Sequence, residues 1–510
     1  MIKITPIERL EAGIAMYLRD RFQWGSVTDI ALRFGITRQY AYYLEDKLIH
    51  AFETIATKGA SNVFTTETQW WCKLILSIRL YCNGSIDGIA RVLAEMESPT
   101  ASTGHVSEIL RMFAEAVSKD KPSPPVGDYV LYGDEIFSVG NPILVLMDAK
   151  SQNILTIKLS EARSSTEWKK VIEELQSLGI NVKYMVKDQG SGLQAAAQEL
   201  GIAELMDLFH LLKKHDPILA RFERKAIGAI TNEYERERVF LNRKSPKTAQ
   251  KAWNAYLESR VMTQAAIRAC DNYECLHLWL HEIFDDFGSD GHHRTLDMAK
   301  ADLAAWRELC ENEFPDCDAI EKGNRFLFKN ADAYWPHFQR MAALIASHGD
   351  VPEITRKTVS LAWHLQRKAT AVKSGAMKAS LHRRSEELMA FATTGISEEL
   401  RKAIGKLIQG LNETFRSSSP LEAINSVLRR YLESCRGQTD QDSLELLAFF
   451  INHRPANRGK HAGTSAQERL TGEHGRPQSA IERIIQLAQK KVVDEPLPFV
   501  ASQQQHAAAS

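Results

Sequence analysis

The sequence predicts an α/β core, a mixed five-stranded sheet with helices, that is interrupted by an all-α insertion and preceded by helical units. Two observations on residue pattern lead to this fold class. Residues 129–208 hold five short runs, most of them rich in β-branched and aromatic residues, separated by turn residues and by two segments of helical periodicity. Residues 213–415 show helical periodicity with hardly any alternating pattern. A chain of 510 residues is also long enough to form several domains.

The N-terminal residues 27–42 carry a helix-turn-helix pattern. A short amphipathic helix is followed by a turn at Gly35 and by a second helix. In proteins of this kind the first residues of the second helix enter the major groove of DNA, where Arg and Gln side chains read base edges. Residues 1–60 are therefore predicted to be a DNA-binding unit. The expected DNA-contacting residues are Thr37, Arg38, Gln39 and Tyr40.

A second pair of helices is predicted at residues 85–93 and 103–110, with a polar break at residues 98–100 between them. The pair repeats the rhythm of helix, turn and helix. Two interpretations stay open, namely a second helical DNA-binding unit over residues 61–125 and an ordinary helical hairpin.

The first strand of the core is predicted at residues 129–137 and carries an acid, Asp134, at its centre. Strand propensity does not favour Asp, so this acid needs another reason for its position. Two more apolar runs follow at residues 143–148 and 154–159, and the polar residues 150–153 between them favour a hairpin turn. Three antiparallel strands are therefore expected.

A helical crossover leads to a fourth strand. The helix has apolar residues at helical spacing and ends at Gly179. The fourth strand, residues 182–187, delivers Asp188 at its carboxyl end, and a further helix and a short strand at residues 203–208 complete the unit. Taken alone, Asp134 and Asp188 can each be solvated acids, and Asp188 can cap the helix that follows it.

Residues 419–422 favour a helix start, with Ser419 as the N-cap and Pro420 at the first helical position. The alternative for the acid in this turn is a capping box, in which the Glu422 carboxylate bonds back to the backbone of Ser419. Helical spacing places on one face Glu422, Asn425, Ser426 and Arg429.

The helical residues 213–415 contain a run of one charge sign. Residues 356–384 hold eight Lys and Arg residues and no Asp or Glu. Such a run predicts a phosphate-binding surface, and the alternative is a solvated helix face. Trp363 in this run is expected to be a core residue rather than a platform for a stacked base. The candidate phosphate-binding residues are Arg356, Lys357, Arg367, Lys368, Arg383 and Arg384.

The order of three strands, a helix, a strand, a helix and a strand, with acids in the first strand and after the fourth, resembles the RNase H-like core of DDE transposases and retroviral integrases. The resemblance covers about residues 126–215 and 415–460. The stretch 419–431 is similar to the third-acid helix of insertion-sequence transposases. Asp207 and His210 resemble a pair found in transposase groups with a large helical insertion, including the hAT group. The alternative for this pair is a histidine packed at a strand end.

The resemblance implies a two-metal site for phosphoryl transfer. Asp134 would bridge two Mg²⁺ ions, Asp188 and Glu422 would each hold one, and Mn²⁺ can take the place of Mg²⁺. Carboxylates suit this role because Mg²⁺ prefers hard oxygen ligands. Glu413 and Glu433 are the alternatives for the third acid. The expected supporting residues are Asp207, His210, Asn425 and Arg429.

The resemblance also implies a function and a domain order. The expected protein is a DNA transposase that binds transposon ends and catalyses metal-dependent strand cleavage and strand transfer through the three acids. Its partners would be transposon-end DNA, target DNA and a second copy, in a homodimer or higher oligomer. The alternative is a transposase-derived DNA-binding regulator without catalysis. The expected domains are the first part of the core at 126–212, the helical insertion at 213–415, the last part of the core at 416–475 and a helical or disordered tail at 476–510.

Composition limits the remaining possibilities. Lys and Arg number 64 and Asp and Glu number 64, so any DNA-binding surface must be local. Seven cysteines without a Cys-x-x-Cys spacing, and no secretory leader, predict a reduced cytoplasmic protein, and the resemblance to bacterial transposases implies that it is nucleoid-associated. No apolar run approaches about 20 residues, which predicts no membrane span. The group Cys270, Cys275, His277 and His281 is expected to serve helix packing rather than to bind zinc.

Overall fold

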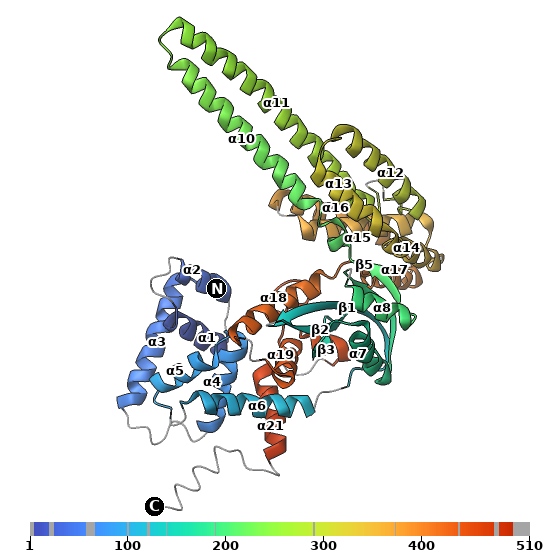
Figure 1. Cartoon of the computed structure of the whole chain (residues 1–510). Helices are drawn as coiled ribbons and strands as arrows, with labels where there is room; N and C mark the ends of the chain where they lie inside the picture. Colours follow the sequence, from blue (N-terminus) through green and yellow to red (C-terminus); the bar gives the residue numbers. More distant parts are fainter. Residues whose placement is uncertain are drawn as a thin grey trace, which may run out of the picture. The chain divides into compact units, whose positions relative to one another are not determined.

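The computed structural model of the protein describes residues 5–19, 25–57, 67–98, 101–119, 123–138, 140–188, 190–288, 291–372, 374–436, 439–473 and 479–492 (Figure 1). By its internal contacts the chain forms two compact units, and the division falls between Ser77 and Ile78. This boundary lies within helix α4 (Glu67–Tyr81) rather than at the predicted domain boundaries of 60/61 and 125/126. Most of the predicted tail at 476–510 lies outside the described residues.

The N-terminal unit contains the predicted helix, glycine turn and helix. Helix α1 (Pro6–Tyr17) packs against α2 (Ser26–Phe34) and α3 (Arg38–Thr57). Gly35 ends α2 with a φ of 64°, a left-handed conformation that glycine adopts without strain. The small core of this unit combines Ala12 and Leu44 with partly buried Phe34, Ile36 and Tyr40.

Helices α5 (Ile86–Glu95) and α6 (Thr103–Lys119) form the second predicted helix pair, and they belong to the larger unit, Ile78–Val493. The apolar face of α6 buries Val106, Ile109 and Phe113, and α6 packs against α19 (Gln441–His453) and α21 (Ala480–Val492). This packing favours the helical-hairpin interpretation of the pair, because one face of its second helix is covered by the rest of the unit.

The predicted five-stranded mixed sheet is confirmed. Its strands are β1 (Gly127–Ser138), β2 (Asn141–Asp148), β3 (Ile154–Leu159), β4 (Ile180–Lys187) and β5 (Ala203–Met206), in the order β3-β2-β1-β4-β5. Strands β1, β2 and β3 pair antiparallel, as expected, whereas β4 and β5 run parallel to β1. The last strand ends two residues earlier than predicted because Asp207 caps the short helix α9 (Leu208–Leu212).

The two faces of the sheet receive different helices. Helices α7 (Ser165–Ser177) and α8 (Ser191–Glu199) pack on the face that carries Tyr129 and Leu131, with Trp168 among the buried side chains. Successive side chains of a strand alternate between faces, so Asp134 lies on the opposite face. There α18 (Ser419–Ser434) packs against β1.

Two glycines allow close packing around the carboxyl ends of β1 and β4. A Cβ at Gly133 would lie 2.7 Å from Leu193 Cδ2 on α8, and a Cβ at Gly192 would lie 1.9 Å from the carbonyl oxygen of Arg163. Helix α8 can therefore approach β1 and the loop before α7 only because both positions lack a side chain.

Within the described part of residues 213–415 the elements are helical, as predicted, apart from one isolated bridge between Phe287 and His293. Prolines stand at the starts of α10, α11 and α14, where their missing N–H groups are tolerated. The elements are α10 (Asp216–Leu241), α11 (Pro246–Ile283), α12 (Leu296–Glu313), α13 (Asp318–Asn330), η1 (Ala331–Ala333), α14 (Pro336–Ser347), α15 (Glu353–Ala371), α16 (Gly375–Thr393) and α17 (Glu398–Asn412). Helices α10 and α11 pack along each other as a long hairpin (Figure 1).

After α17 the chain returns to the sheet through α18 and α19, and α20 (Ala466–Thr471) and α21 follow. Helix α19 packs against the edge strand β3, and Asn452 on it donates a hydrogen bond to the Ile154 carbonyl. The α/β core is therefore built from two stretches of chain on either side of the helical segment. Among the helices of the described ranges, none is both long and apolar enough to cross a membrane.

Candidate active site

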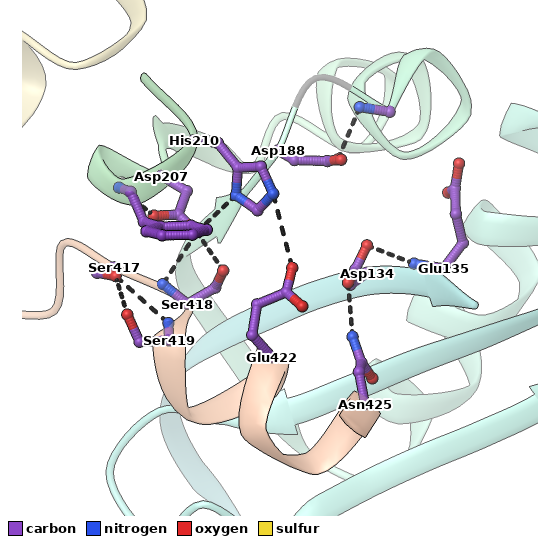
Figure 2. Close-up of polar contacts among 12 residues, drawn as sticks. Asp134, Glu135, Asp188, Asp207, His210, Ser417, Ser418, Ser419, Glu422 and Asn425 are labelled. Carbon is purple, nitrogen blue, oxygen red and sulfur yellow. Dashed lines mark hydrogen bonds and ion pairs between the residues drawn. The ribbon is translucent and has the colours of Figure 1, made fainter. Parts of the chain in front are cut away.

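The parallel pairing of β1 with β4 brings the first two predicted acids together. Gly133 on β1 is the register partner of Lys187 on β4, and Asp134 and Asp188 are the residues that follow them. Beyond Gly133, β1 pairs with β2 but no longer with β4. Asp134 therefore lies at the point where the pairing of β1 with β4 ends. Figure 2 shows both acids at this place, together with Glu422 from α18.

Asp134 is held on both of its carboxylate oxygens. Asn425 Nδ2 donates to its Oδ2 at 2.6 Å, and the backbone N–H of Glu135 donates to its Oδ1 at 2.8 Å. Asn425 is fully buried and lies one turn after Glu422 on α18. The predicted shared face of Glu422 and Asn425 is therefore directed at β1.

The electrostatics of Asp134 are unfavourable for a carboxylate. Burial, the charge of Asp188 and the charge of Glu422 raise the pKa of Asp134 to about 7, against the opposing effect of the Glu135 N–H. An ordinary aspartate in water titrates near pH 4. The fold thus keeps Asp134 close enough to Asp188 and Glu422 for their charges to disfavour its ionised form.

Glu422 reaches the site by a local structure that differs from the predicted one. The N-cap of α18 is Ser418 rather than Ser419, so Pro420 occupies the second helical position. The Ser418 side chain makes no cap hydrogen bond because its hydroxyl bonds to Asp207 instead. The alternative capping box is therefore wrong. The Glu422 carboxylate lies 3.6 Å from His210 Nε2 and 3.9 Å from Arg429 Nη1.

The predicted pair Asp207 and His210 forms the link between β5 and α18. Asp207 is completely buried and accepts hydrogen bonds from the N–H of Phe209 at 2.8 Å, the N–H of Ser418 at 3.2 Å and the Ser418 hydroxyl. His210 Nδ1 lies 3.0 Å from the same carboxylate. His210 stands on α9 with its other nitrogen toward Glu422.

These bonds shift the pKa values of both partners. Burial by itself would raise the pKa of Asp207, but the hydrogen bonds from His210 and Ser418 outweigh it and lower that pKa. The bond to Asp207 raises the pKa of His210 despite burial. The pair is therefore stabilised as carboxylate and imidazolium, with a proton available on each imidazole nitrogen of His210.

Helix α18 is fixed at both ends. On the N-terminal side, the carbonyl of Arg416 accepts from the N–H of Leu208 at 3.0 Å, and the Arg416 side chain donates to the Phe284 carbonyl at 2.7 Å. On the C-terminal side, buried Arg79 donates to the Tyr431 hydroxyl at 3.1 Å, with its guanidinium 4.1 Å from the Tyr431 ring centre. Glu422 is thus held by a helix whose ends are anchored to two other parts of the larger unit.

The set of side chains fits divalent cations. It offers hard carboxylate oxygens, and the pKa of Asp134 is raised by burial and by the charges of Asp188 and Glu422, a repulsion that a cation would relieve. The three acids do not gather as in a single-ion site, where all ligand atoms would lie within 4.8 Å of one another. Two ions about 3.5 to 4 Å apart do not need such a cluster, because acids that hold different ions can stand up to about 8 Å apart.

Sequence reasoning missed two residues at this site. Glu135, with its side chain 12% exposed, lies beside Gly190 opposite Asp188 and pairs with Arg163 at 3.2 Å. Ser418 orients Asp207, as described above. The adjacency of Glu135 to Asp134 was the available signal for the first, whereas nothing in the sequence distinguishes Ser418 from its serine neighbours.

The alternatives for the third acid lie elsewhere. Glu413 pairs with Lys150, in the turn after β2, at 2.7 Å. Glu433 is exposed on α18, three turns beyond Glu422. Arg429, predicted as a supporting residue, has its side chain 51% exposed and reaches Glu422 only at 3.9 Å.

The predicted DNA-contacting residues of the N-terminal unit differ in their surroundings. Thr37 accepts a hydrogen bond from the Tyr40 N–H at 3.1 Å and so caps α3. Arg38 and Gln39 are exposed in the first turn. Tyr40 packs on the core of the unit and stacks on Tyr43, with ring centres 5.6 Å apart. Arg38 and Gln39 are therefore the two side chains free to reach a ligand.

Three of the six candidates in the basic run are matched by acids from outside the run. Lys357 pairs with Glu353 at 2.6 Å, and Lys368 pairs with Asp285 at 3.0 Å. Arg367 lies 3.8 Å from buried Asp286. The remaining candidates are Arg356, which donates to the His348 carbonyl, and exposed Arg383 and Arg384 on α16.

Trp363, in the same run, is buried, and its indole N–H donates to Asn412 at 2.9 Å. The prediction that it is a core residue is confirmed.

Comparison with known proteins gives no family: no protein-family model matches the chain, and no curated protein matches it. The functional argument therefore depends on the geometry of the site.

Proposed function

We propose that the protein is a DDE-type transposase with an RNase H-like core, which cuts and joins DNA strands at Asp134, Asp188 and Glu422. The observation that carries this proposal is the placement of the acids. One stands inside β1, one directly after β4 and one on a helix that crosses β1 after about 200 residues of helical chain. The strand order β3-β2-β1-β4-β5, with the first three strands antiparallel, is the order that such a core requires.

Asp134, Asp188 and Glu422 would hold Mg²⁺, and the bound ions would supply stabilisation of the negative charge that grows on the attacking and leaving oxygens of the phosphate. A structural role alone does not account for the three acids, because burial of Asp134 beside the charges of Asp188 and Glu422 costs stability and raises the pKa of Asp134 to about 7.

The other side chains of the site act on these acids. Asn425 fixes the rotamer of Asp134 by donating to Oδ2. His210 receives its orientation from Asp207 and directs Nε2 toward Glu422, so a protonated His210 would hold the Glu422 carboxylate in place. Asp207 and His210 are therefore positioning residues in this proposal.

Binding of DNA is assigned to two surfaces, each on its own unit. Exposed Arg38 and Gln39 on α3 would read base edges at the transposon end. Exposed Arg383 and Arg384 on α16 would contact phosphates, which gives affinity without sequence preference. A homodimer or higher oligomer follows from the reaction, because two transposon ends must be brought together.

The test is strand cleavage and joining on duplexes that carry the ends of the element encoding this chain, in Mg²⁺ and in Mn²⁺. Asp134→Asn and Asp188→Asn should bind these duplexes as the wild type does and should lose cleavage by about 10³-fold or more. Asp148→Asn is the matched control, because Asp148 ends β2 in the same sheet and bonds to Ser151. Wild-type binding without cleavage would favour the regulator without catalysis and would refute the proposal.

A further inference from the structure

A second group of metal-ligating side chains lies at the open end of the α10–α11 hairpin. Ligand atoms of Asp216, His277 and His281 all lie within 4.8 Å of one another. Asp216 is the first residue of α10, and the two histidines stand one turn apart near the end of α11. Among the described residues, the cysteines of α11 do not join this group, so a zinc site with Cys270 or Cys275 is not formed.

The distances suit a tetrahedral ion. His277 Nε2 lies 3.0 Å and His281 Nε2 lies 3.8 Å from the same oxygen, Asp216 Oδ1. Around a zinc ion with bonds of about 2.0 to 2.2 Å, neighbouring ligand atoms stand about 3.3 to 3.5 Å apart. The two measured separations bracket this range, so small side-chain rotations would complete three of the four positions.

The histidine spacing presents both imidazoles to one place. Residues four apart on a helix lie on the same face, and two histidines at this spacing form half of the zinc site in helical H-E-x-x-H proteases. Here the ring centres of His277 and His281 are 4.7 Å apart.

The surroundings hold the group in place and leave it open on one side. The His277 side chain is 12% exposed, whereas those of His281 and Asp216 are 46% and 52% exposed. Behind them, fully buried His215 bonds through Nδ1 to the Tyr273 hydroxyl at 3.0 Å, which fastens the start of α10 to α11. The exposed side has room for a water molecule as a fourth ligand.

We propose that Asp216, His277 and His281 form a binding site for a transition-metal ion of the Zn²⁺ type. Two imidazoles and one carboxylate prefer such an ion to Mg²⁺, which takes oxygen ligands. The ion would fasten α10 to α11 close to α9, the helix that carries His210. It would therefore make the junction between the hairpin and the sheet rigid. This site is independent of the proposed DNA chemistry.

The test is a calorimetric titration of Zn²⁺ into the tag-free, full-length protein after chelator treatment, with Mg²⁺ in excess to occupy the carboxylates of the triad. Because loss of an outer-shell partner already weakens metal affinity by about 10- to 100-fold, His281→Ala should weaken binding by at least about 100-fold. Its partial exposure makes this variant safe for folding, so it decides the matter even if His277→Ala does not fold. Cys275→Ser, an exposed position on the same helix, is the matched control.

Three results together would support the site: one Zn²⁺ bound per chain, its loss in His281→Ala, and wild-type affinity in Cys275→Ser. Thermal unfolding gives a second readout, because bound Zn²⁺ should raise Tm in the wild type and in Cys275→Ser but not in His281→Ala. Equal affinity in the wild type and His281→Ala, or no binding by the wild type, would overturn the proposal.

Discussion

Replacing Asp134 with Asn should stabilise the larger unit while it removes the metal-dependent activity. The pKa of Asp134 is raised from 3.8 to about 7 by burial and by Asp188 and Glu422. One pKa unit corresponds to about 1.4 kcal/mol, so ionising Asp134 at neutral pH costs at most about 4 kcal/mol of the free energy of unfolding. Asn keeps the shape of the side chain and lacks the charge. Asn has one acceptor oxygen for the two N–H groups that bond to Asp134, a loss of about 1 to 3 kcal/mol, so we expect a net gain on the order of 1 to 3 kcal/mol.

The pH dependence has a definite sign. An acid whose pKa is raised by folding stays protonated in the folded state while the unfolded chain is already ionised. Its contribution to stability is thus fully present below about pH 4 and is lost as the pH rises to about 7. The gain from Asp134→Asn should therefore be absent near pH 4 and largest above pH 7. Mg²⁺ should stabilise the wild type above pH 7 and leave the variant nearly unchanged.

Thermal and urea unfolding between pH 4 and 8, with and without Mg²⁺, measures these effects. The matched variant is Asp148→Asn, since buried Asp148 accepts from the N–H of Ser151 at 2.7 Å and from its hydroxyl at 2.5 Å. Loss of these charge-assisted bonds should destabilise the unit by about 1.5 to 3 kcal/mol. If Asp134→Asn destabilises the unit as Asp148→Asn does, burial beside Asp188 and Glu422 does not disfavour the Asp134 carboxylate, and the reasoning fails.

Three further outcomes are expected. Asp207→Ala leaves Ser418 and His210 without their buried partner and should lower the free energy of unfolding by about 3 to 5 kcal/mol; a Tm equal to that of the wild type would contradict the described link. His210→Ala should reduce cleavage by about 10- to 100-fold. The raised pKa of His210 adds stability that is fully present below about pH 6.5 and is lost at higher pH, and this pH-dependent stability should be absent from the variant. Arg38→Ala should weaken the binding free energy for end DNA by about 1 to 3 kcal/mol in gel-shift assays. The double variant Arg383→Ala and Arg384→Ala should reduce the slope of log affinity against log salt concentration by the amount expected for about two phosphate contacts.

The sequence predicted the sheet well because its strands differ from their surroundings in period and residue type. The expected hairpin at residues 150–153 and the acid inside β1 are both present. The pairing of β1 with β4 could not be predicted from local pattern, although it decides that Asp134 meets Asp188. Register between distant strands depends on which faces are buried in the whole unit.

The details of the site depend on contacts over long separations in sequence. Ser418 loses its capping role because Asp207, far away along the chain, takes its hydroxyl. The basic run looked unopposed because its partners Asp285 and Asp286 lie about 80 residues earlier in the chain, just after the end of α11. His277 and His281 could not be grouped with Asp216 from the sequence, because Asp216 lies on a different helix. In each case the sequence shows the residue type but not the distant residue that folding brings next to it.

The central claim is that Asp134, Asp188 and Glu422 form one site that cuts DNA, and Glu422 is the acid that depends most on the fold. The most direct measurement is therefore single-turnover cleavage of end DNA in Mg²⁺ by the wild type, Glu422→Gln and Glu433→Gln, two variants on the same helix. The site as described predicts a loss on the order of 10³-fold for Glu422→Gln and wild-type cleavage for exposed Glu433→Gln. Cleavage by Glu422→Gln at the wild-type rate, or no cleavage by the wild type, would contradict it.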